Sequence, residues 1–147
     1  LSLAFLRQKQ VDLCELEASL VYIVSSRLAR ATKILSQKEE IEEQMRIFME
    51  ELSEKNEGKR AYIEKKVHEI YARQDEIDAV INEKATGWTT SRMAKVDLAL
   101  IRLAVYEIKY EADIPTGVAI NEAVELAKVY SSDGAPAFVN GVLAKLV

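Results

Sequence analysis

The chain has 147 residues, of which 49% are hydrophobic and 30% are charged, and its formal net charge at pH 7 is −4. This length fits one domain, or two small helical sub-bundles that share a core, and the acidic balance argues against a globally basic nucleic-acid-binding protein. One cysteine excludes an internal disulfide, and one histidine leaves too few ligands for a Cys/His zinc site. No apolar run reaches the roughly eighteen residues of a membrane span. We therefore expect a cytoplasmic protein without a cofactor.

The first part of the chain carries a helical pattern. In residues 1–35, apolar residues recur at spacings of three and four from Leu13 to Leu28, which indicates one apolar helix face. Ser36 followed by Glu39 is a capping-box signature, and it predicts a helix with one apolar and one glutamate-rich face. Two further helices are expected over about Arg60–Arg73 and about Glu76–Glu83.

Glycine and proline punctuate the second half. Gly87 is expected to stop the preceding helix. A strongly apolar helix then follows from about Ser91, and it ends before Pro115, which cannot continue a helix.

Two shorter helices complete the pattern. Thr116 is expected to cap a helix over about Gly117–Tyr130, and Pro136 to lie in the first turn of a last helix that reaches about Leu146. No alternation typical of strands is sustained anywhere. The sequence therefore predicts an all-α fold, a bundle of about six or seven helices.

No combination of residues typical of catalysis stands out. His68 lies on a charged helix without a nucleophile beside it, and Cys14 has no positive neighbour in sequence to lower the pKa of its thiol. We therefore expect a helical binding or interaction protein and not an enzyme. Phe138 follows a polar turn at the start of the last helix, where its ring either belongs to the core or stacks on an unpaired base.

Three stretches carry a more specific signal. "GWTTSRMAKVDLALIRLAVYEIKY", "DIPTGVAINEAVELAK" and "APAFVNGVLAKL" closely resemble the NusB family of bacterial transcription antitermination factors, in the same order and spacing. Together they cover residues 87–146, and a weaker similarity extends back to about Lys38. The resemblance implies one NusB-like domain over residues 1–147, with a first sub-bundle over 36–84 and a second over 87–147.

The resemblance also implies a function and a set of contacts. Family members bind boxA-type single-stranded RNA together with NusE, the tenth protein of the small ribosomal subunit, and help RNA polymerase to read through terminators, notably in ribosomal RNA operons. Asp97 matches an acidic position that faces NusE, and this suits a basic partner. Phe138 matches an aromatic residue associated with RNA contact. Thr116, Asp133 and Ala137 lie on turns near the same RNA-facing surface.

Residues 1–35 depart from the family, whose members normally begin with an Arg-rich stretch that contacts phosphates. Arg27, Arg30 and Lys33 are a candidate replacement, because a spacing of three places them near one helix face. Two alternatives stay open on the sequence. One is a protein-interaction or homodimerising module with little RNA binding, and the other is the NusB-like domain of a ribosomal RNA methyltransferase.

Overall fold

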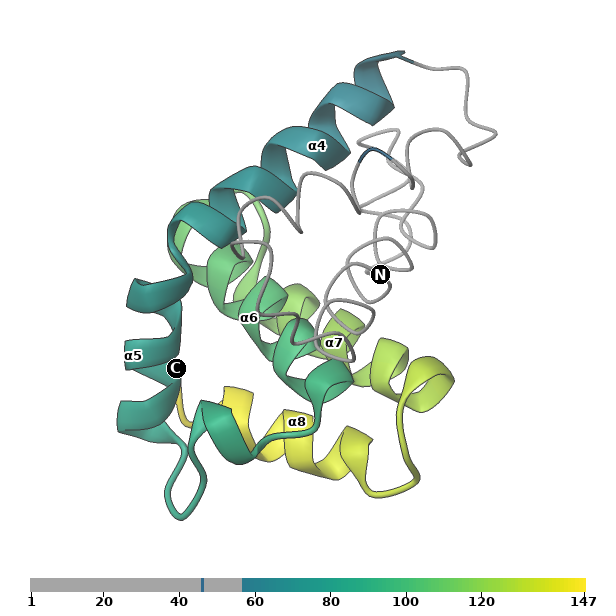
Figure 1. The fold of residues 1–147 in the computed structure, drawn as a ribbon. Coiled ribbons are helices and arrows are strands. Elements are labelled where there is room, and N and C mark those ends of the chain that lie inside the picture. Colours follow the sequence, from purple (N-terminus) through teal and green to yellow (C-terminus); the bar gives the residue numbers. More distant parts are fainter. Residues whose placement is uncertain (1–45, 47–56) are drawn as a thin grey trace.

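The computed structural model describes Arg46 and residues 57–147. In this part of the chain all regular structure is helical, and the helices pack into one bundle (Figure 1). In chain order they are α4 (Glu57–Ala72), α5 (Gln74–Lys84), the short 3-10 helix η1 (Thr90–Arg92), α6 (Lys95–Tyr110), α7 (Thr116–Tyr130) and α8 (Ala135–Ala144). The predicted all-α fold is confirmed. The helices expected before residue 57, with the cap at Ser36, lie outside the described residues.

Glycine and proline set most helix boundaries as expected. Gly87 lies in the turn after α5 with a φ of 83°, which glycine adopts without a steric penalty. Pro136 lies in the first turn of α8. The expectation that Thr116 caps α7 is wrong, because Pro115 holds the N-cap position with the extended φ of −61° and ψ of 140°. Thr116 is the first helical residue, and no side chain caps this helix.

α6 is the central helix of the described bundle. It packs against α4, α5, α7 and α8. Every residue from Asp97 to Glu107 is buried, as expected for a helix that is surrounded on all sides. It begins at Lys95 and not near Ser91, because the chain first makes the separate turn η1.

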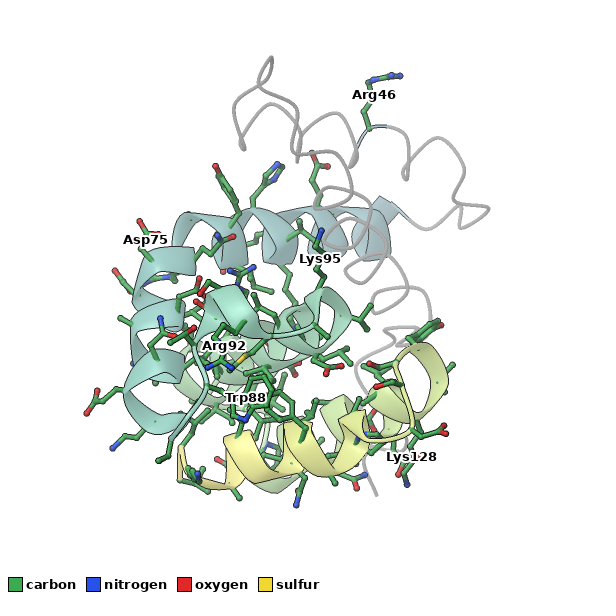
Figure 2. The ribbon with its side chains drawn as sticks, turned by 60° about the horizontal axis from the view of Figure 1, so that its bottom comes forward. Arg46, Asp75, Trp88, Arg92, Lys95 and Lys128 are labelled. Atoms are coloured by element: carbon green, nitrogen blue, oxygen red, sulfur yellow. The ribbon has the colours of Figure 1, made fainter. Side chains whose placement is uncertain are left out.

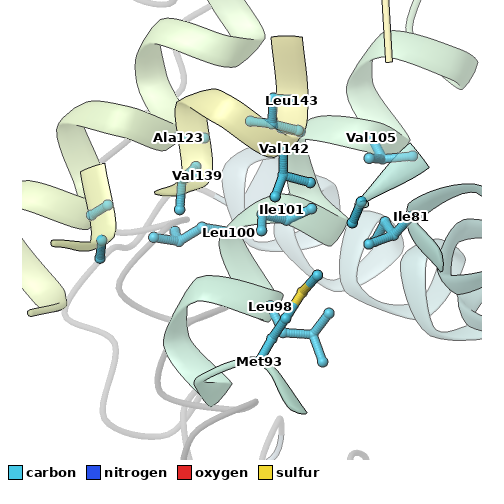
Figure 3. Close-up of a cluster of buried hydrophobic side chains, with 14 of the residues drawn as sticks. Ile81, Met93, Leu98, Leu100, Ile101, Val105, Ala123, Val139, Val142 and Leu143 are labelled. Atoms are coloured by element: carbon cyan, nitrogen blue, oxygen red, sulfur yellow. The ribbon is translucent and has the colours of Figure 1, made fainter. Parts of the chain in front are cut away.

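The hydrophobic core lies between α5, α6, α7 and α8 (Figure 3). Its largest fully buried side chains are Ile77, Ile81, Leu100, Ile101, Val105, Val139 and Leu143. Each such aliphatic side chain contributes about 1.5–3 kcal/mol by leaving water. This core fixes the two ends of α8 and the start of α6, and therefore the turns that they carry.

Polar contacts join α5 to α6. Arg102 makes a two-pronged ion pair with Asp78, with Nε 2.8 Å from Oδ1 and Nη2 2.7 Å from Oδ2. Nearby, the hydroxyl of Tyr110 donates a hydrogen bond of 2.8 Å to Glu76, and the guanidinium of Arg73 lies 4.2 Å from the centre of the Tyr110 ring. None of the described helices combines the length and the apolar character needed to cross a membrane.

Candidate functional site

Three of the residues that the sequence assigned to RNA contact lie together at the start of α8. Asp133 in the preceding turn and Ala137 in the first turn of the helix are both exposed. Phe138 is half-buried and packs against the edge of the core. Its backbone N–H donates a hydrogen bond of 3.2 Å to the carbonyl of Gly134, which starts the helix. The fold therefore presents these side chains from one short segment.

Thr116, another predicted RNA contact, is not brought to this segment. Thr116 is half-buried and begins α7, whereas the turn that carries Asp133 follows the end of α7. α7 has 15 residues, so at a rise of 1.5 Å per residue its two ends lie about 22 Å apart. Arg27, Arg30 and Lys33 lie outside the described residues.

Sequence reasoning missed Trp88. Its ring centroid lies 5.2 Å from that of Phe138, and the two ring planes meet at 71°, an edge-to-face pair. The guanidinium of Arg92 lies 5.4 Å from the centre of the Trp88 ring (Figure 2). Trp88 is 44% exposed. The sequence feature that could have pointed to this residue is that the chain has one tryptophan, which directly follows Gly87 in a turn.

The loop that carries Trp88 is held against the end of α5. The backbone N–H of Trp88 donates to the carbonyl of Ala85 over 3.1 Å. The side chain of Asn82 makes two contacts with Thr90, accepting from its backbone N–H over 2.8 Å and donating to its hydroxyl over 3.4 Å. These bonds fix the loop that carries Trp88 relative to the end of α5.

Asp97 lies in the first turn of α6, where a negative charge is favoured by the helix dipole. It is only 6% exposed, and its Oδ1 accepts a hydrogen bond from the hydroxyl of Ser131. This bond ties the start of α6 to the turn before α8. Just before Ser131, the apolar side chains of Val129 and Tyr130 are exposed. Contact between Asp97 and a partner protein stays a prediction.

A second polar cluster lies between α4 and the end of α6. It borders a cavity of about 290 Å³ that is lined by Lys65, Lys66, Glu69, Tyr106, Tyr110, Glu111 and Asp113. The buried Nζ of Lys66 lies 3.8 Å from Oε2 of Glu107 and 3.3 Å from Oε1 of Glu111. The hydroxyl of Tyr106 donates a hydrogen bond to Glu69.

Burial changes the protonation of this cluster. Loss of water raises the pKa of Glu107 to about 7, although the charge of Lys66 acts in the opposite direction. Burial, and then the hydrogen bond to Glu69, raise the pKa of Tyr106 far above its ordinary value, so its phenol stays neutral and donates. Among the described residues, no group of three or more His, Cys, Asp or Glu side chains is placed to hold a metal ion. The cluster offers proton binding and ion pairing.

The chain is similar in sequence to proteins of one family. The sequence model of the NusB family matches residues 25–147. The transcription antitermination protein NusB of Agathobacter rectalis is 60% identical over 108 residues, which cover 74% of this chain and 82% of that protein. The protein of the same name from Acetivibrio thermocellus is 48% identical over 111 residues, or 76% of each chain.

Solved structures agree with the sequence comparison. A structure of NusB from T. maritima superposes with a TM-score of 0.73 at 26% identity, covering 89% of this chain and 87% of that one. A structure of the antitermination factors NusB and NusE in complex with double-stranded RNA superposes with a TM-score of 0.71 at 26% identity. This second match covers 90% of the present chain and 92% of the solved one.

Proposed function

This chain belongs to the NusB family, and we propose that it is a transcription antitermination factor, which binds RNA together with NusE and helps RNA polymerase to read through terminators, notably in ribosomal RNA operons. The observation that carries this function is the 60% identity to an antitermination protein over 82% of that protein's length. The preferred RNA is a boxA-type single strand. The role is binding without catalysis, and it is carried out in the cytoplasm.

Two places on the described bundle support these contacts. The start of α8 offers a half-buried ring, Phe138, beside the exposed Ala137 and Asp133, and this segment suits contact with an unpaired base. The start of α6 carries Asp97, with the exposed Val129 and Tyr130 close to its partner Ser131 in sequence. The negative charge of this carboxylate, which is 6% exposed beside Ser131, suits a basic protein such as NusE.

RNA binding measured by fluorescence anisotropy tests the function directly. A labelled boxA-type single strand is titrated with the protein, with and without purified NusE, and a scrambled strand of the same length is the control. We expect sequence-dependent binding that strengthens when NusE is added. Equal affinity for both strands under both conditions would contradict the antitermination role and favour a homodimerising interaction module.

Phe138→Ala is expected to weaken binding of the boxA-type strand by about 1–3 kcal/mol, because it removes an aromatic face on which a base can stack. Phe138 also packs against the core, so Phe138→Leu serves as the matched variant that keeps apolar contact and loses the ring. Both variants are measured by anisotropy after circular dichroism has established their helical content. Wild-type affinity in the leucine variant would show that the ring does not contact RNA.

Asp97→Asn is expected to weaken binding of NusE, because it removes a negative charge and keeps the size of a buried side chain that Ser131 contacts. Isothermal calorimetry with purified NusE measures the change. Ser131→Ala is the control, since it removes the hydrogen bond and leaves the charge. An unchanged dissociation constant for Asp97→Asn would remove this carboxylate from the interface.

A further inference from the structure

The rings of Trp88 and Phe138 form the two walls of a corner at the surface. They come from different elements, the loop after α5 and the first half of α8, and meet at 71° with centroids 5.2 Å apart. Because the planes are nearly perpendicular, a flat group stacked on one ring presents its edge to the other. Phe138 is half-buried, whereas Trp88 leaves 44% of its surface exposed. The indole is therefore the more exposed of the two rings, and the guanidinium of Arg92 lies over one of its faces.

The charge around this corner favours a nucleic acid. The guanidinium of Arg92 lies 5.4 Å from the centre of the indole ring, and Arg92 makes no ion pair with a carboxylate in the part of the chain that the structure describes. The stretch from Ala85 to Val96 contains no aspartate or glutamate, although the whole chain carries 24 acidic residues. An exposed aromatic ring can stack on a base, and an arginine beside it can contact a phosphate. The absence of acidic residues from this stretch removes charges that would repel the phosphate.

From this geometry we infer that Trp88, Phe138 and Arg92 form a site for one unpaired RNA base, with Trp88 as its main stacking surface. The inference rests on the proposed RNA-binding function and adds two contacts to it. The base stacks on the indole and meets the ring of Phe138 along its edge. The guanidinium of Arg92 contacts the neighbouring phosphate or the base itself. The bonds from Asn82 to Thr90 hold the loop in place before RNA arrives.

The single tryptophan makes this site directly observable. Intrinsic tryptophan fluorescence of the wild-type protein is followed while an unlabelled boxA-type single strand is added, with and without NusE. In parallel, anisotropy of the labelled strand reports binding independently of Trp88. We expect the indole emission to be quenched along the same binding curve, because a stacked base is in direct contact with the ring.

Two substitutions of Trp88 separate stacking from apolar packing. Trp88→Leu is expected to weaken RNA binding about 5- to 150-fold, the range for loss of one base–aromatic stack. Trp88→Phe keeps a ring and is expected to restore most of the affinity. Tyr71→Leu is the matched control, since Tyr71 is half-buried on α4, a helix that carries none of the three residues of this site. It should bind the strand as the wild-type protein does.

The outcomes distinguish this site from the function on which it rests. RNA binding with unchanged tryptophan emission, and wild-type affinity in Trp88→Leu, would overturn the site and leave the antitermination role standing. Equal weakening by Trp88→Leu and Tyr71→Leu would also overturn it, as a general effect of losing an aromatic side chain. No RNA binding by the folded wild-type protein, with or without NusE, would overturn the proposed function and this site together.

Discussion

Arg102→Ala is expected to lower the free energy of unfolding by about 3–5 kcal/mol, the usual range when one partner of a buried ion pair is removed. Arg102 and Asp78 are joined by two short hydrogen bonds, and their side chains are only 10% and 19% exposed. The substitution leaves the carboxylate of Asp78 without its guanidinium between α5 and α6. Urea unfolding followed by circular dichroism measures the change.

A surface pair within the same bundle provides the control. Lys128 and Glu125 also lie 2.8 Å apart, but their side chains are 55% and 53% exposed. Lys128→Ala should therefore cost less than about 1 kcal/mol. Arg102→Lys should fall between the two, because an ammonium group cannot reproduce the two parallel bonds. If Arg102→Ala cost no more than Lys128→Ala, the pair with Asp78 would not stabilise the fold.

The raised pKa of Glu107 is expected to make the free energy of unfolding depend on pH. Its pKa is raised from 4.5 to about 7, so between these pH values the native state binds more protons than the unfolded state. The free energy of unfolding therefore contains a contribution that is full below pH 4.5 and is lost as the pH rises through 7. One pKa unit corresponds to about 1.4 kcal/mol, so the loss reaches about 3 kcal/mol.

Glu107→Gln isolates this contribution, because glutamine is neutral at every pH and Lys66 keeps Glu111 at 3.3 Å as its partner. Unfolding by urea is compared for the variant and the wild-type protein from pH 4 to pH 8. The variant should gain stability relative to the wild-type protein as the pH rises through this window. The charges of Lys66, Glu111 and Glu122 act on the same carboxylate, and they are unchanged in the comparison. A difference that does not vary with pH would contradict the raised pKa.

Local sequence patterns predicted the helices because their signals are local. Gly87 and Pro136 impose backbone conformations on their own residues, and the structure has them where the sequence placed them. Thr116 shows the limit of this reasoning, since both it and Pro115 suit the start of a helix and the proline takes the N-cap. The pattern could not decide which of two adjacent residues ends up at the cap.

Contacts between distant segments could not be predicted in the same way. Nothing in the sequence around Trp88 indicates that its ring meets Phe138, because that contact depends on how α8 packs against α6 and α7. Charged residues show the same difficulty. Lys66 and Glu107 are buried together, although their residue types are typical of a solvated surface. Burial of such a pair follows from the bundle as a whole.

The surroundings of α6 also bear on how proteins with this fold diverge. Each position from Asp97 to Glu107 is buried, so nearly every exchange along that helix carries a packing or desolvation cost. Changes that alter recognition are therefore expected more readily in the exposed connections around α6, where a side chain can change without disturbing its neighbours. The loop with Trp88 and the turn before Phe138 are two such connections. New binding preferences can arise there while the central helix is held nearly constant by selection for stability.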